Sequence, residues 1–165
     1  MEIFRGRRLW IEQRNIRLPN GLGRQKVIVH PGNAVAILPI EGGQSKLIRQ
    51  YRYAIDDYII EAPAGTLEKG EDPLAAAGRE LIEETGFAAQ IIEPMGFVIT
   101  TPGFTDEKIY LYEAHGLTPS HEFDKDDDEV IEVVDIPVRD LNHMIRDGTI
   151  IDAKTICLIL RCLRC

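Results

Sequence analysis

Apolar and polar residues alternate in short stretches through the first part of the chain, which predicts β-structure. Residues 7–18 alternate loosely, a turn sequence follows at 19–23, and residues 25–30 read as the returning strand of a hairpin. Residues 33–40 are almost continuously apolar, which predicts a buried core strand. Five further strands are expected, at 45–53, 58–62, 88–100, 108–115 and 130–136.

A helical pattern runs from Asp72 to Gly86. Asp72 is a suitable N-cap, Pro73 suits the first helical position, and Gly86 suits the position that closes a helix. Small and apolar residues recur at helical spacing and predict a narrow packing face, namely Leu74, Ala77, Gly78 and Leu81. Two more helices are predicted, at 137–147 and 152–163.

Strands and helices mix without a regular βαβ alternation, and no internal repeat or linker separates them. This order predicts an α+β or α/β/α-layered domain. We divide the chain into an N-terminal β-hairpin segment, residues 1–32, and a main domain, residues 33–165. An isolated hairpin is at best marginally stable in water, so the segment is expected to pack against another surface.

Composition narrows the possible functions. With 165 residues, 44% of them hydrophobic and 28% charged, the chain fits one globular domain with a core. A net charge of −8 argues against nucleic acid or an anionic membrane as a partner. We see neither a signal peptide nor a membrane span, and expect a cytoplasmic protein. Three cysteines, Cys157, Cys162 and Cys165, lack a nearby fourth zinc ligand and are interpreted as reduced thiols.

Three carboxylates share one face of the predicted central helix. Glu80, Glu83 and Glu84 are spaced by three and four residues, so their like charges repel one another. A hard divalent cation such as Mg²⁺ would reverse the sign of that interaction. Arg79 lies four residues before Glu83 and is placed to orient it. The alternative is a solvated acidic helix face with a glycine cap.

The stretch from Gly65 to Phe87 resembles the Nudix box. That motif consists of Gly, five residues, Glu, seven residues, and then Arg-Glu-aliphatic-any-Glu-Glu-any-Gly-aliphatic. Eight residues of this chain match it, namely Gly65, Glu71, Arg79, Glu80, Leu81, Glu83, Glu84 and Gly86. Phe87 departs from the usual aliphatic residue, which concerns packing rather than chemistry.

Other stretches resemble the ADP-ribose pyrophosphatase branch of the Nudix hydrolases. They lie before the box, at 47–53 and 61–65, and after it, at 101–107 and 148–155. The resemblance covers about residues 47–160. It implies a Mg²⁺-dependent hydrolase, with Mn²⁺ as a possible substitute, that splits ADP-ribose or a related nucleoside diphosphate sugar into AMP and ribose 5-phosphate.

The resemblance also implies roles for residues of the box. Glu80, Glu84 and the carbonyl of Ala64 correspond to metal ligands. Glu83 corresponds to a further ligand or to a residue that orients water, and Arg79 to the group that holds it. Phosphoryl chemistry needs charge neutralisation and alignment rather than a covalent nucleophile, which agrees with such a set.

Four residues outside the box are candidate substrate contacts. Arg52 corresponds to an arginine that holds phosphate, and its guanidinium fork suits that contact, although it could be an ordinary strand-surface charge. Gly103 lies in a loop that shapes the pocket in the family, or in a plain turn. Glu107 is expected to point toward the terminal ribose. Trp10 is either a core residue or an aromatic face that stacks on the base.

The acidic run 124–129 precedes a predicted strand. It fails as an EF-hand because Glu129 occupies the sixth position, where glycine is needed. In the family a mobile loop here supplies an acidic group. We therefore favour Glu129 as the residue that binds metal or water, assisted by Asp127, with Glu83 as the rival general base. Relatives are homodimers whose N-terminal hairpin joins the partner's substrate site, and we expect the same here.

Three alternative functions are weighed against this hydrolase. A different nucleotide sugar or a dinucleoside polyphosphate is the nearest alternative substrate. A binding module with the same fold but without catalysis would typically have lost glutamates of the box, and all are present here. A plain acidic interaction protein does not explain the spacing of the helix carboxylates and the upstream arginines.

Overall fold

The computed structural model of the chain describes residues 1–123 and 130–163. Its elements follow the order β1 Glu2–Arg5, β2 Trp10–Arg17, β3 Gly23–His30, β4 Ala34–Glu41, β5 Gln44–Arg52, β6 Asp57–Glu61, β7 Ala64–Thr66, α1 Pro73–Thr85, β8 Phe87–Ile99, β9 Lys108–Pro119, β10 Ile131–Pro137, α2 Val138–Arg146 and α3 Ala153–Cys162. Among these residues, no helix is both long and apolar enough to cross a membrane.

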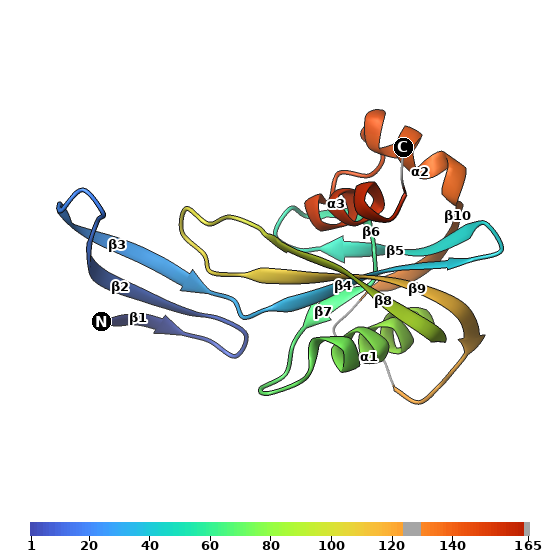
Figure 1. The fold of residues 1–165 in the computed structure, drawn as a ribbon, viewed down its shortest axis with the longest axis horizontal. Helices are drawn as coiled ribbons and strands as arrows, with labels where there is room; N and C mark the ends of the chain where they lie inside the picture. The colour runs from blue at the N-terminus through green and yellow to red at the C-terminus, as the bar shows by residue number, and fades with distance from the viewer. Residues whose placement is uncertain (124–129, 164–165) are drawn as a thin grey trace.

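The main sheet contains seven strands in the order β10-β5-β4-β9-β8, with β6 paired to β5 and β7 paired to β4. Strands β4 and β9 run parallel, whereas the other pairs are antiparallel, so the sheet is mixed. Helix α1 covers one face, and α2 and α3 cover the other (Figure 1). The predicted α+β fold with α/β/α layers is confirmed.

Strand β4 lies at the centre of both cores, as its continuous apolar sequence predicts. Ala36 and Leu38 pack toward α2 and α3, whereas Val35 and Ile37 pack toward α1. Because side chains alternate across a strand, every second residue of this run packs into the same layer, and its neighbours pack into the other.

Helix α1 has the predicted ends. Asp72 accepts hydrogen bonds from the backbone N–H groups of Leu74 and Ala75, and Gly86 closes the helix in the left-handed conformation with φ 75°. The predicted packing face is partly wrong. Leu74 is 47% exposed, whereas Ala76, Ala77, Leu81 and Ile82 are buried. Leu74 belongs to the first turn of α1, and the buried apolar residues begin at Ala76.

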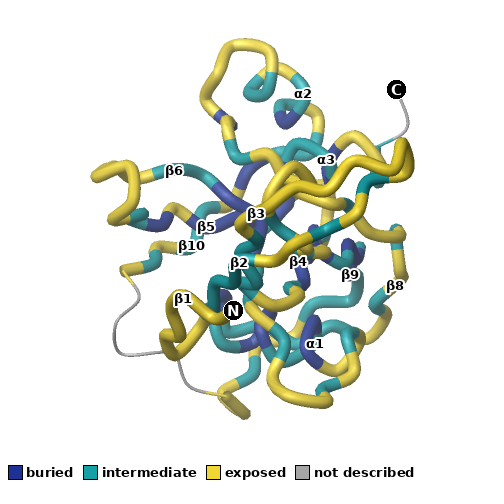
Figure 2. The backbone as a smooth tube through the Cα atoms, turned by 90° about the vertical axis from the view of Figure 1, so that its left-hand side faces the viewer, coloured by how far each residue is buried: buried dark blue, intermediate teal, exposed yellow. Residues whose placement is uncertain are grey.

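The N-terminal segment is a three-stranded antiparallel sheet, β1-β2-β3, rather than a hairpin. The sequence analysis missed β1 because four residues are too short to show a period. This sheet projects from the main body (Figure 1), and most of its residues are exposed (Figure 2). It is connected to the 101–107 loop by a backbone hydrogen bond from Val29 to Phe104 and by a contact between His30 Nδ1 and Asp106 of 2.6 Å.

Candidate active site

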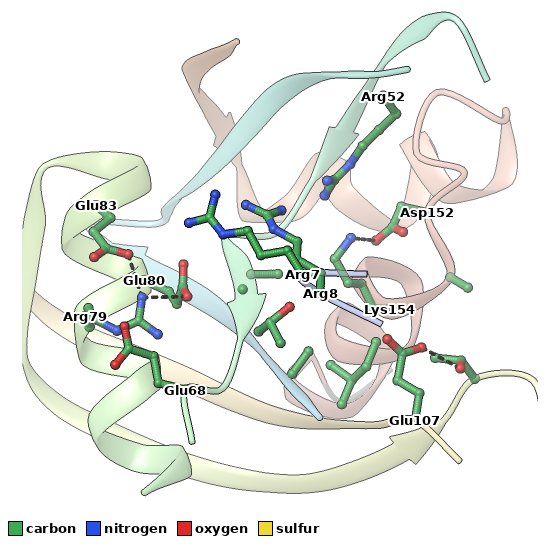
Figure 3. A pocket seen from close by; sticks show the side chains of 17 residues that line it. Arg7, Arg8, Arg52, Glu68, Arg79, Glu80, Glu83, Glu107, Asp152 and Lys154 are labelled. Atoms are coloured by element: carbon green, nitrogen blue, oxygen red, sulfur yellow. Dashed lines mark hydrogen bonds and ion pairs between the residues drawn. The ribbon is translucent and has the colours of Figure 1, made fainter. Parts of the chain in front are cut away.

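A cavity of about 590 Å³ lies beside β7, the start of the loop that follows it, and the C-terminal half of α1. Its size is that of a small-molecule site. The wall from β7, the following loop and α1 is acidic except for Arg79, and Figure 3 shows its carboxylates on one side of the cavity. Cationic side chains from β5, from α3 and from the β1–β2 connection complete the lining, namely Arg52, Lys154, Arg7 and Arg8.

Arg79 connects the carboxylates of the acidic wall. Its guanidinium donates to Glu71 at 2.9 and 3.1 Å and to Glu83 at 2.7 Å, and it pairs with Glu80 at 2.7 Å. The hydrogen bonds that Arg79 donates to Glu71, together with the nearby negative charges, raise the pKa of Arg79 above its ordinary value, despite partial burial. The predicted role of Arg79 in holding Glu83 agrees with this geometry. Its simultaneous contact with Glu71 explains why the box contains that more distant glutamate.

Glu80 and Glu84 converge on the start of β7, at Ala64 and Gly65. Glu84 is buried and accepts a hydrogen bond of 2.8 Å from the Ala64 N–H. The Glu80 carboxylate packs against Gly65, where a side chain would occupy the same space. Ala64, Glu80 and Glu83 line the cavity directly, and Glu84 lies behind them.

The opposite wall contains a second ionic cluster, built around the buried carboxylate of Glu61. Arg52 donates to Glu61 through Nε at 2.6 Å and Nη2 at 2.7 Å. Lys154 also pairs with Glu61, and with Asp152 at 3.1 Å. Burial alone raises the pKa of Glu61, but the hydrogen bond from Arg52 and the charge of Lys154 outweigh it and lower that pKa. The hydrogen bonding of Arg52 to Glu61 in turn raises the pKa of Arg52.

The other predicted substrate residues are divided between two places. Glu107 lines the cavity and accepts a hydrogen bond of 2.6 Å from Thr100. Gly103 is exposed and does not line it. Trp10 borders a separate cavity of about 390 Å³. Its ring is stacked on His30 at 3.8 Å, with the Arg5 guanidinium 5.2 Å from its centre.

Several lining residues were not selected from the sequence. Arg7 and Arg8 reach the cavity of their own chain, and a basic pair at the start of the first predicted strand of an acidic protein was the available signal. Asp152 is the first residue of the last predicted helix, and Lys154 belongs to the family-like stretch 148–155, but neither was chosen as a site residue. Asp127 and Glu129 lie outside the described residues, and their role stays a prediction.

Comparison with known proteins identifies the family to which the chain belongs. The Nudix domain family matches residues 30–158, well over half of the chain. The chain belongs to the Nudix family. The box from Gly65 to Phe87 is thus the family's motif, folded as the loop and helix of the acidic wall.

Relatives and a solved structure resemble this Nudix hydrolase over most of its length. It is 37% identical to a methanol dehydrogenase activator from Bacillus methanolicus, over 94% of this chain and 85% of the relative. It is 36% identical to an ADP-ribose pyrophosphatase from Bacillus subtilis, over 93% of this chain and 84% of that protein. A crystal structure of an ADP compounds hydrolase superimposes with a TM-score of 0.88 at 25% identity, covering 98% of this chain and 88% of that one.

The box residues fit a divalent cation in their chemistry. Within residues 1–123 and 130–163, no three acidic, histidine or cysteine side chains converge as a complete cage. Mg²⁺ seldom uses such a cage, because it usually takes one or two carboxylates together with water and substrate phosphates. Glu80 and Glu84, beside the backbone of Ala64, supply that number of carboxylates.

Proposed function

We propose that this Nudix hydrolase cleaves the pyrophosphate bond of ADP-ribose or a related nucleoside diphosphate sugar, with Mg²⁺ as cofactor. Water oxygen forms a bond to one phosphorus while the bond from that phosphorus to the bridging oxygen breaks. The water gives up a proton to a base, and the second phosphate leaves with the bridging oxygen. The products from ADP-ribose are AMP and ribose 5-phosphate.

The observation that carries this proposal is the opposition of two charged walls across one cavity. Glu80 and Glu83 stand on one side, and Arg52 and Lys154 on the other. A diphosphate needs cations around its oxygens, and in a chain of net charge −8 these must be supplied locally. Arg52 and Lys154 are paired with Glu61 and Asp152, so on that side they supply hydrogen-bond donors, with Arg7 and Arg8 as further cationic side chains of the cavity. The carboxylates of the acidic wall supply ligands for a metal.

Glu80 and Glu84, with the Ala64 carbonyl, are the proposed ligands of the cation. When bound, it neutralises charge on the diphosphate and acidifies a nearby water. Arg79 keeps Glu83 beside these ligands, so the acidic side chains hold their places although they repel one another. Arg52 contacts phosphate through the part of its guanidinium that is not bonded to Glu61.

The proton acceptor is proposed to come from residues 124–129, with Glu129 as first choice and Asp127 assisting. Glu83 is the rival because it lies in the cavity on a rigid helix. However, its Oε2 atom already accepts the hydrogen bond from Arg79 at 2.7 Å. That oxygen is therefore less available to accept a proton from water, which favours the loop.

A substrate panel tests the proposal. ADP-ribose, UDP-glucose, GDP-mannose and diadenosine polyphosphates are each supplied with Mg²⁺, with Mn²⁺, or with EDTA, and kcat/KM is measured. We expect the highest value for ADP-ribose or a close ADP-sugar, and no turnover in EDTA. Preference for GDP-mannose or a dinucleoside polyphosphate would move the substrate to the alternative class. No hydrolysis of any member would favour a binding module.

A further inference from the structure

Glu61 is the most deeply buried acidic side chain of the cavity's cationic wall. The residue is 1% exposed, yet it lies at the end of β6, three residues before Ala64. A buried carboxylate is stable only when its charge is compensated. Here two cations compensate it, the guanidinium of Arg52 and the ammonium of Lys154.

The position of Lys154 is itself fixed by α3. Asp152 caps the helix by accepting from the Thr155 N–H at 2.9 Å and the Thr155 hydroxyl at 2.6 Å, and the same carboxylate pairs with Lys154 at 3.1 Å. The Thr155 hydroxyl in turn accepts a hydrogen bond of 2.8 Å from the Ala62 N–H, next to Glu61. The start of α3 is therefore bound to the end of β6 through both side chain and backbone.

Resting on the proposed role of Arg52 as a phosphate ligand, we infer that Lys154 is a positioning residue that sets how Arg52 meets the substrate. The cluster holds two negative and two positive charges, so it is balanced. Without Lys154, the Arg52 guanidinium alone faces the whole charge of Glu61. Arg52 already donates to both oxygens of Glu61, so as the remaining cationic partner it is held there more strongly and is less free to turn toward the phosphate.

The contacts of Lys154 are with carboxylates of the wall, so its effect on Arg52 passes through Glu61. The Lys154 side chain is largely buried, and its ammonium donates to two carboxylates of the wall. Arg52 is more exposed and uses only Nε and Nη2 for Glu61, so Nη1 is not part of that pair. In Figure 3 the Lys154 ammonium and the Arg52 guanidinium lie side by side on one wall of the cavity. Lys154 thus compensates the charge of Glu61, and Arg52 is the residue of this pair that contacts the ligand.

Lys154→Gln is the main test, because its amide can still donate to Glu61 while the charge is lost. We expect KM for the best substrate of the panel to rise about tenfold, the loss of one charged hydrogen bond, with kcat within about threefold of wild type. Lys154→Arg, which keeps the positive charge, should have a KM close to that of wild type. Lys46→Met is the matched control, since Lys46 makes a comparable pair with Asp135 at 2.8 Å but does not line the cavity. Thermal unfolding checks that all variants fold.

Binding separates this inference from the function on which it rests. The dissociation constant of α,β-methylene ADP-ribose is measured by calorimetry for Arg52→Gln, Lys154→Gln and the double variant. We expect both single variants to bind more weakly than wild type. In the Arg52→Gln background, adding Lys154→Gln should change the dissociation constant by no more than about twofold. An equal cost in both backgrounds would mean that Lys154 contacts the ligand itself, and would overturn the inference alone. An unchanged constant for Arg52→Gln would instead refute the phosphate role of Arg52, and with it the inference.

Discussion

Gly65 and the Glu80 carboxylate occupy adjoining space so tightly that a Cβ atom on Gly65 would lie 2.0 Å from Glu80 Oε1. The glycine is not required by its backbone, because Gly65 is not among the residues with positive φ. It is required by the approach of a carboxylate from the next element of the chain. The first glycine of the box is therefore part of the site.

Gly65→Ala should displace the Glu80 carboxylate without unfolding the protein, because the obstructing atoms are the end of a flexible side chain. A misplacement of about 1 Å at a reacting centre can cost about 10²-fold in rate, so we expect kcat/KM to fall by roughly that factor. Kinetics with circular dichroism measure both parts of the prediction. Gly23→Ala is the control, since a Cβ there meets nothing within 4 Å. Activity of Gly65→Ala near that of the control would refute the role of this approach.

Glu84→Gln tests the predicted metal ligand. The variant keeps the shape and can still accept the hydrogen bond from Ala64, so the fold should remain. One anionic ligand is lost, and we expect turnover to fall on the order of 10²–10³-fold even with saturating Mg²⁺. Glu93→Gln, on the exposed side of β8, provides a carboxylate control. Turnover within a few-fold of wild type would exclude Glu84 as an essential ligand.

Glu61 predicts a specific pH dependence of stability. Its pKa is lowered in the folded protein from an ordinary value of 4.5. A depressed carboxylate pKa contributes stability that is complete above about pH 4.5 and is lost as pH falls through the folded value. Glu61→Gln lacks this contribution. The difference in unfolding free energy between wild type and variant, measured with urea from pH 7 to 3, should therefore shrink below about pH 4.5. A difference independent of pH would contradict the assignment.

The sequence predicted the fold and the acidic wall because both depend on local patterns. Caps at Asp72 and Gly86, and carboxylates repeated along one helix, need no knowledge of the remaining chain. The cationic wall was harder to predict. Arg52 and Lys154 are 102 positions apart and meet only because α3 packs against the end of β6. Of these two residues, only Arg52 was predicted to contact the substrate, and that prediction came from the family resemblance. Leu74 was misplaced because helical spacing defines a face but does not show where the sheet beneath it ends.

Trp10 and Gly103 show the limit of carrying residues over by resemblance. Each was chosen for its type, an aromatic ring or a glycine loop, and neither lines the large cavity. One face of the Trp10 ring is stacked on His30, and Arg5 lies over the ring. Stacking of Trp10 on a base therefore remains a prediction that requires these side chains to be exchanged for the ligand.

Assembly is the fourth prediction. The N-terminal sheet carries exposed apolar side chains, Ile3, Phe4, Leu22 and Val27. Because exposed apolar patches mark interaction surfaces, we propose that a second copy covers them and that the chain is a homodimer. Sedimentation at micromolar concentration should give a dimer for wild type and a monomer for Val27→Glu. Ile91→Glu, an equally exposed change on β8, should leave the dimer intact. A fully active wild-type monomer would refute the proposal.

The last prediction concerns the base, for which three carboxylates compete. Glu83 has a fixed place in the cavity, but its Oε2 atom already accepts from Arg79 at 2.7 Å, which leaves that oxygen less available to a water. Glu129 and Asp127 lie outside the described residues, and their side chains differ in reach by one methylene group. Removing a general base costs about 10²–10⁴-fold in rate. We therefore expect kcat to fall for both Glu129→Gln and Asp127→Asn, more for Glu129→Gln, with KM little changed.

Glu83→Gln completes this comparison. If Glu83 only supports the site, the variant retains a side chain that can accept from Arg79, and its kcat should fall less than that of Glu129→Gln. The pH profile adds an independent measure, because removing the base should abolish the acidic limb of kcat, whereas removing a supporting residue should lower the curve without changing its shape. Near-wild-type kcat for both loop variants, together with a collapse for Glu83→Gln, would place the base on α1 instead.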